Sequence, residues 1–147
     1  MSVVTDQEIA CLHSQRLGRL ATVGADGQPH VVPVRFRYNA DTDSIDIGGF
    51  ASRKKRRDVE HSGRASIVVD DVPPPWNPRG IEIRGAAHAL PEGGKTIQPS
   101  FDPELIRITR DASSAGGSRA IPTLAVALLK PQRRRTLREA CCSARST

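Results

Sequence analysis

The 147-residue sequence is poor in aromatic residues, which make up only 3% of it. Val, Ile, Leu and Ala must therefore fill the core, and the stacked rings that single-strand nucleic-acid binders use are missing. No apolar run approaches the roughly 20 residues of a membrane-spanning helix, and no basic-then-apolar leader opens the chain. These absences predict a soluble cytoplasmic protein that does not bind membranes.

Motifs for nucleotides and metals are also missing. Neither GxGxxG nor GxxxxGK[ST] occurs, which argues against a Rossmann or P-loop domain. The three cysteines, Cys11, Cys141 and Cys142, form no CxxC or His/Cys spacing, so we expect reduced thiols and no metal site. The four histidines are scattered and suggest no nucleophile and base pair, so the sequence identifies no catalytic residue.

The positive charge is concentrated near the C-terminus. The net charge is +6, yet the stretch from Lys130 onward alone holds six Lys or Arg and one Glu. The basic balance is therefore weak evidence for a specific nucleic-acid partner. We expect one folded domain over residues 1–110 and a partly disordered C-terminal extension over residues 111–147.

Hydrophobic periodicity predicts mostly strands. Alternating, β-branched runs between turn residues indicate strands at 19–23, 29–38, 44–49, 64–70, 79–90 and 103–109. Helical spacing behind a capping residue indicates helices at 5–16 and 52–61. This pattern favours a mainly β antiparallel barrel over a parallel α/β sheet. Pro33 lacks a backbone donor, so we expect it at a bulge or an edge.

The stretch that most suggests a ligand is Ser52 with the five cations Arg53 to Arg57. It follows a strand that ends in Gly48 and Gly49, so a phosphate could receive hydroxyl, guanidinium and ammonium donors at the start of a helix. Lys/Arg runs are more often solvated surface or a non-specific patch. The glycines before the run and the acidic residues just after it favour an ordered anion site.

Several segments, in order along residues 5–109, carry a family resemblance. They are Arg19-Leu-Ala-Thr-Val, Pro33-Val34, Ser44-Ile-Asp-Ile-Gly-Gly, Ser52-Arg53-Lys54, Arg64-Ala-Ser-Ile-Val-Val-Asp-Asp71, and Trp76 with Arg79-Gly-Ile-Glu-Ile-Arg-Gly85. This succession resembles the pyridoxamine-phosphate-oxidase-like flavoproteins, whose fold is an FMN-binding split β-barrel. Within them it is similar to the subgroup that uses the deazaflavin coenzyme F-420, which includes reductases acting late in tetracycline-type antibiotic pathways.

The resemblance implies a homodimer with cofactor sites at its interface. It also implies hydride transfer from reduced F-420 to a double bond of a small molecule, with the cofactor supplying the reactivity. The cofactor-binding residues that it implies are Ser52, Arg53 and Lys54 at the phosphate, Pro33, Val34, Gly48 and Gly49 along the ring system, and Trp76 and Arg79 from the interface loop. Arg56 and Arg57 would suit a longer acidic tail.

Alternative functions remain open at this level. The same fold could use FMN with oxygen as the acceptor, or hold a cofactor without catalysis, or bind nucleic acid through its basic residues. The substrate is not fixed, and water, Tyr38 or the substrate itself could donate a proton. The apolar stretch 121–129 predicts either an added strand or helix, or a non-native extension from a shifted reading frame.

Overall fold

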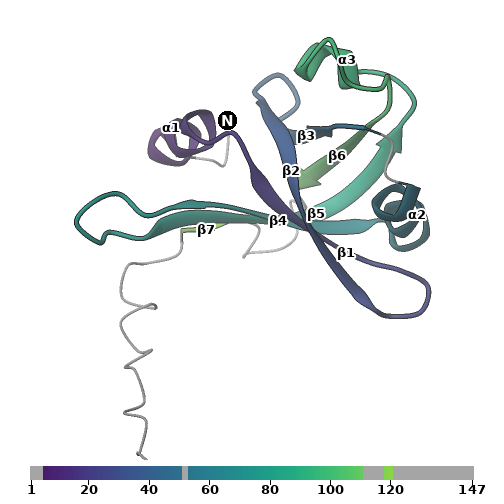
Figure 1. The fold of residues 1–147 in the computed structure, drawn as a ribbon, viewed down its shortest axis with the longest axis horizontal. Coiled ribbons are helices and arrows are strands. Elements are labelled where there is room, and N and C mark those ends of the chain that lie inside the picture. The colour runs from purple at the N-terminus through teal and green to yellow at the C-terminus, as the bar shows by residue number, and fades with distance from the viewer. Residues whose placement is uncertain (1–4, 51–52, 111–117, 121–147) are drawn as a thin grey trace, which may run out of the picture.

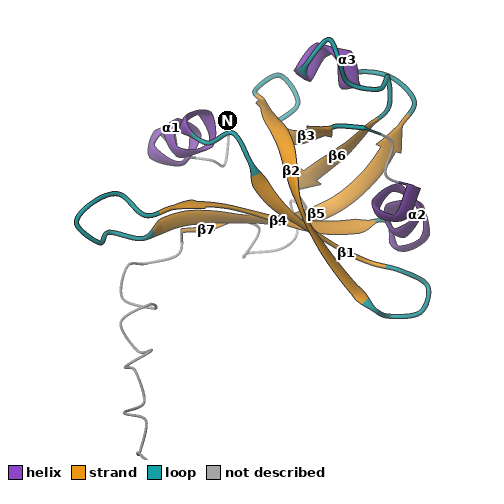
Figure 2. Cartoon of the chain, in the orientation of Figure 1, coloured by secondary structure: helices purple, strands orange, loops and turns teal. Residues whose placement is uncertain are grey.

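The computed structural model describes residues 5–50, 53–110 and 118–120. The elements, in chain order, are α1 (Asp6–Ser14), β1 (Gly18–Val23), β2 (Pro29–Asn39), β3 (Ser44–Gly48), α2 (Arg53–Ser62), β4 (Arg64–Asp71), β5 (Arg79–Leu90), α3 (Gly94–Ile97), β6 (Leu105–Arg110) and β7 (Ser118–Ala120). Figure 2 shows that strands dominate and that the helices are short. The predicted mainly β class is confirmed.

The strands form one antiparallel sheet that closes on itself. Their order is β4-β1-β2-β3-β6-β5, and a further pairing between β4 and β5 closes a six-stranded barrel (Figure 1). The short β7 pairs with β5 opposite Ile81 to Ile83. Because the β4–β5 pairing closes the sheet, neither β4 nor β5 is left as an outermost strand, which limits edge-to-edge association.

Two long strands change partner midway, and this divides the barrel into two halves. In β2, residues 29–34 pair with β1 and residues 35–39 pair with β3. In β5, residues 79–86 pair with β4 and residues 85–90 pair with β6. Pro33 lies where β2 has a partner on one side only, so its missing N–H breaks no ladder bond. The edge position predicted for Pro33 is confirmed.

The core is aliphatic, as the composition requires. Leu20, Ile45, Ile47, Ile67, Val69, Ile81 and Ile108 are almost fully buried inside the barrel. Leu12 from α1 and Val59 from α2 pack against the same cluster. Side chains alternate between the two faces of a strand, so the residues between these positions face outward.

Both predicted helices are present, and one more appears. A capping box joins Thr5 to Glu8 at the start of α1, and Gly63 follows α2 with a φ of 64° that favours glycine. The short α3 was not predicted, and it lies between the strands expected at 79–90 and 103–109. None of the described helices is long and apolar enough to cross a membrane.

Candidate functional site

The basic run forms the first turns of α2, and the helical spacing sends its cations to different places. Lys54 lies within 3.4 Å of Asp58, and Arg56 within 2.8 Å of Glu60, each pair four residues apart. Arg56 also reaches Glu104 at 2.6 Å. Lys55 lies between Lys54 and Arg56 in the sequence. Unlike these two neighbours, it has no ion pair or hydrogen bond to any described residue.

Asp58 is a buried carboxylate, only 3% exposed, at the junction of α2 and the barrel. Thr22 Oγ1 donates to Asp58 Oδ2 at 2.9 Å, and His30 Nδ1 lies 3.7 Å from the same oxygen. Burial raises the pKa of Asp58, but the hydrogen bonds from Thr22 and Lys54 and the charge of Lys54 outweigh it and leave the pKa below its ordinary value. Asp58 therefore neutralises Lys54 in part.

Lys55 lies in a small pocket between α2, the end of β3 and the segment that leads into β6. The pocket is lined by Ile47, Gly48, Gly49, Phe50, Lys55, Arg56, Asp102, Glu104, Leu105 and Ile106. Burial lowers the pKa of the Lys55 ammonium, since a half-buried charge without a counter-ion loses hydration. The interior measures about 50 Å³, which admits one small group but not a ring system.

The two glycines predicted to approach a ligand have different surroundings. A Cβ at Gly48 would lie 2.8 Å from Phe101 Cδ2, so this glycine makes room for Phe101 rather than for a ligand. Gly49 has a φ of 157°, and a Cβ there would lie 3.6 Å from Lys55 Nζ. The carbonyl of Gly49 accepts from the Asp102 N–H at 3.3 Å. Both glycines line the lysine pocket, and Gly49 is the one whose Cβ position lies against Lys55.

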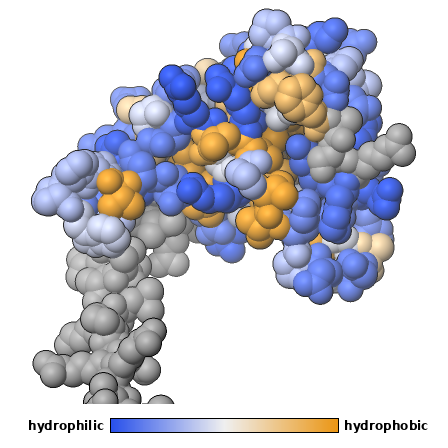
Figure 3. All heavy atoms as spheres, in the orientation of Figure 1, coloured by the Kyte–Doolittle hydropathy of each residue, from blue (hydrophilic) through white to orange (hydrophobic). Residues whose placement is uncertain are grey.

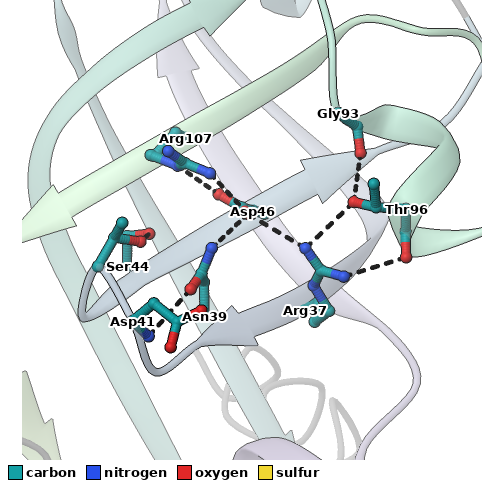
Figure 4. Close-up of polar contacts among 9 residues, drawn as sticks. Arg37, Asn39, Asp41, Ser44, Asp46, Gly93, Thr96 and Arg107 are labelled. Atoms are coloured by element: carbon teal, nitrogen blue, oxygen red, sulfur yellow. Dashed lines mark hydrogen bonds and ion pairs between the residues drawn. The ribbon is translucent and has the colours of Figure 1, made fainter.

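A second buried carboxylate, Asp46 of β3, lies at the centre of a polar network on the outer face of the barrel (Figure 4). Arg107 donates to both its oxygens at 2.7 and 3.0 Å, and Asn39 donates at 3.2 Å. Arg37 lies 3.6 Å from Asp46 and donates to the Thr96 carbonyl and hydroxyl at 3.0 and 3.1 Å. The network therefore ties α3 to the outer face of β2 and β3.

The charges around Asp46 determine its ionisation. Burial raises the pKa of Asp46, but the hydrogen bonds of Arg107 and Asn39 and the charges of Arg107 and Arg37 outweigh burial, so the pKa is lowered. Strand register explains the arrangement, because Arg37, Asp46 and Arg107 are direct cross-strand neighbours on β2, β3 and β6. We call these three residues the Asp46 row.

The structure brings only some of the predicted site residues together. Gly48 and Gly49 lie beside α2, whose first residue is Arg53, whereas Ser52 lies outside the described residues. Lys54 lines a hollow on the other side of α2, facing the turn between β1 and β2. Pro33 is exposed on β2, and Val34 points into the core.

Trp76 and Arg79 lie far from α2 in the same chain. Figure 1 places the tip of the β4–β5 hairpin and α2 on opposite sides of the barrel. Trp76 is 66% exposed there. Arg79 donates to both oxygens of Asp71 at 2.7 and 2.9 Å, and this hydrogen bonding lowers the pKa of Asp71. A single chain therefore does not bring together all the residues that the resemblance implies.

Sequence reasoning missed three features of this region. It did not single out Lys55 from its basic neighbours, although the buried Val59 one turn later marks the helix face that Lys55 shares. It gave Asp46 no role, because an acidic residue in an alternating strand normally faces water. It also missed Glu104, whose partner Arg56 is distant in sequence and so has no local signal.

The closed six-stranded antiparallel sheet, with a basic helix at one side, defines a split β-barrel protein. A sequence model described as pyridoxamine 5'-phosphate oxidase matches residues 4–138. The chain belongs to the pyridoxamine 5'-phosphate oxidase family.

One similar protein carries a more specific name than the family does. It is a 5a,11a-dehydrotetracycline/5a,11a-dehydrooxytetracycline reductase of Streptomyces rimosus, 44% identical over 108 residues that cover 71% of this chain and 76% of the relative. The family and this relative both carry the names of oxidoreductases, and oxidoreductase activity is the class of function that they support for this chain.

Solved structures share the fold. A putative pyridoxamine 5'-phosphate oxidase from Listeria innocua is 18% identical, with a TM-score of 0.60 over 79% of this chain and 96% of that one. An F420 reductase is 22% identical, with a TM-score of 0.59 over 74% of this chain and 97% of that one. At these identities the similarity concerns the fold alone.

Proposed function

We propose that this protein is a reductase that uses the reduced deazaflavin coenzyme F-420 to transfer a hydride to a double bond of a small organic substrate. The observation that carries the proposal is the basic start of α2, with Lys54 and Lys55 on either side of it and Gly49 beside Lys55. The Streptomyces relative supports a tetracycline-type polyketide intermediate as the substrate class.

The residues present fit an acidic cofactor. Lys55 is a half-buried ammonium that has no counter-ion among the described contacts, and an anionic group would supply one. Arg53 and Lys54 are the cations that would meet the cofactor phosphate. The cofactor, when bound, supplies the hydride, and the protein holds its anionic end and shields the reacting face from water.

A homodimer would complete the site, and we propose one. The lysine pocket is too small for a ring system, and Trp76 and Arg79 are remote from α2 in one chain. The outer face of β1 and β2 exposes apolar side chains, with Val31 62% exposed opposite Ala21. Figure 3 shows apolar surface gathered at the centre of this face. A second protomer would cover it and bring its hairpin to the site.

Cofactor titration tests the proposal directly. The full chain is titrated with F-420 and with FMN by fluorescence, together with Lys54→Ala, Lys55→Met and the control Lys95→Ala, an exposed lysine of α3. We expect tight F-420 binding that weakens in the first two variants and is unchanged in the control. Preference for FMN would favour an FMN-dependent enzyme of the same family, and binding of neither would favour a module without catalysis.

Light scattering after size exclusion tests the dimer. We expect a mass of two chains for the wild type and for Lys95→Glu, and one chain for Val31→Glu, because a carboxylate in an apolar interface is costly to desolvate. A monomeric wild type that still binds F-420 would refute the shared site and leave the cofactor proposal intact.

A further inference from the structure

A second hollow lies between α1 and β2, and we call it the α1–β2 pocket. It is lined by Leu12, His13, Gln15, Arg16, Arg35, Phe36, Arg37 and Tyr38 and measures about 300 Å³. This volume is at the lower end of small-molecule sites. Three arginines and a histidine line the pocket, and no Asp or Glu is among its lining residues.

The arginines of this pocket differ in how they are paired. Arg37 is committed to Thr96 and lies beside Asp46. Arg16 and Arg35 have no ion pair or hydrogen bond to any described residue. Five other arginines of the described helices and strands have a carboxylate partner: Arg19, Arg56, Arg79, Arg84 and Arg107. Two of the arginines that line the α1–β2 pocket therefore have no carboxylate partner within the described part of the chain.

Exposed arginines are usually only solvated. Arg16 follows α1 and Arg35 lies in β2, however, and these two elements are fixed to each other. Leu12 of α1 is 2% exposed in the core, and the ring of His13 packs edge-on against Tyr38 with centroids 6.3 Å apart. Tyr38 in turn donates to Asp43 at 2.7 Å. The end of α1, which precedes Arg16, is thus held against the strand that carries Arg35.

The polar groups of the pocket select the chemistry of a ligand. Two guanidiniums offer planar, paired donors, which suit the two oxygens of a carboxylate or phosphate better than a neutral acceptor. Other donors are used elsewhere, since the Gln15 amide donates to Asp71 at 2.7 Å. Phe36 and Tyr38 also line the pocket but are mostly buried, each only 7% exposed.

We propose that the α1–β2 pocket binds the anionic oxygen group, a carboxylate or a phosphate, of a small molecule through Arg16 and Arg35. The proposal goes beyond the proposed function, because no residue of α2 or of the lysine pocket lines this hollow. The position is nevertheless close to that region, since Arg35 is the direct cross-strand neighbour of Gly48. An acidic substrate held there would lie one strand away from the glycines beside α2.

The test uses plain anions, so that it does not depend on any cofactor. Citrate and inorganic phosphate are titrated into the full chain at low ionic strength, with binding followed by calorimetry. The variants are Arg16→Gln, Arg35→Gln, Lys54→Ala and the charge-matched control Lys95→Gln. Unchanged melting temperatures confirm that each variant is folded.

We expect Arg16→Gln and Arg35→Gln each to weaken citrate binding about fivefold or more, with the control Lys95→Gln within roughly twofold of the wild type. Phosphate should bind more weakly than citrate and respond to the same two variants. Equal binding by wild type, Arg16→Gln and Arg35→Gln would overturn the proposal. So would a loss in Lys54→Ala alone, which would assign the anion to α2. A failed F-420 titration leaves this result unaffected.

Discussion

Asp46 and Asp58 are both buried carboxylates with a lowered pKa, yet they are held in different ways. Arg107 donates two short hydrogen bonds to Asp46. Asn39 donates a third hydrogen bond, and Arg37 forms an ion pair with the same carboxylate. Asp58 has one short bond, from Thr22, while Lys54 lies 3.4 Å away and His30 3.7 Å away. The contacts of Asp46 form a fixed structural link. The contact between Asp58 and Lys54 is looser, so a bound anion could draw Lys54 away from Asp58.

The difference follows from where each acid lies. Asp46 is in the middle of a strand, so its neighbours are set by register and all come from the sheet. Asp58 is on a helix whose Lys54 is half exposed, and an exposed partner is screened by water and contributes little. We infer that the Asp46 row serves stability, whereas the Asp58 cluster is linked to the proposed anion site.

Removal of Asp46 should give the largest effect. Asp46→Ala leaves two guanidiniums without their shared carboxylate, and breaking a buried ion pair costs about 3–5 kcal/mol. Urea unfolding followed by circular dichroism measures the loss. Asp41→Ala, in the exposed turn between β2 and β3, is the control and should change little. A cost for Asp46→Ala as small as that of the control would show that the row is not a structural link.

Removal of Asp58 should cost less. Asp58→Ala leaves the buried Thr22 hydroxyl without its acceptor, for which we expect about 2 kcal/mol in the same assay. Because the variant also frees Lys54, we expect its affinity for an anionic cofactor to be kept or raised, provided that it is folded. Weaker cofactor binding by the folded variant would contradict the division between the two acids.

Gly48→Ala probes the packing of the segment that Arg37 holds through Thr96. The added methyl would meet Phe101 at 2.8 Å and Ile97 at 3.0 Å, and overpacking of this kind costs roughly 1–2 kcal/mol. The companion variant Gly27→Ala has open space around it but a φ of 72°, so it reports backbone strain without a clash. Equal unfolding midpoints for Gly48→Ala and the wild type would mean that Phe101 moves aside freely.

The pH dependence of stability should show the smallest difference between the acids. Both carboxylates have a folded pKa below the unfolded value of about 3.9. Their contribution is therefore complete above that value and is lost as the pH falls through the folded pKa. We expect the wild type to lose stability between about pH 5 and pH 2, and Asp46→Asn to show a shallower slope than Asp58→Asn. The slopes are measured by following unfolding at a series of acid pH values. A shallower slope for Asp58→Asn than for Asp46→Asn would mean that Asp58, and not Asp46, contributes more to stability.

Most of the fold could be predicted from local pattern. The six strands were predicted within a few residues of their bounds, because alternation and turn residues are encoded locally. The two longer helices were marked by capping and spacing. The four-residue α3 has no such signal, and its position depends on contacts with Arg37 and Gly48. The predicted boundary at residue 110 remains a prediction, and β7 from beyond it joins β5. The predicted strand or helix at 121–129 lies outside the described residues.

The candidate site was predicted only in part, and the reason is physical. The sequence by itself determined that five cations follow a glycine pair, that an aliphatic core must form, and that Lys54 and Asp58 share a helix face. Tertiary structure alone decided that Lys55 enters a pocket where no described residue pairs with it while Arg56 meets Glu104, and that Asp46 lies between arginines from two other strands. Composition and spacing fix which charges exist, whereas sheet closure fixes which of them meet.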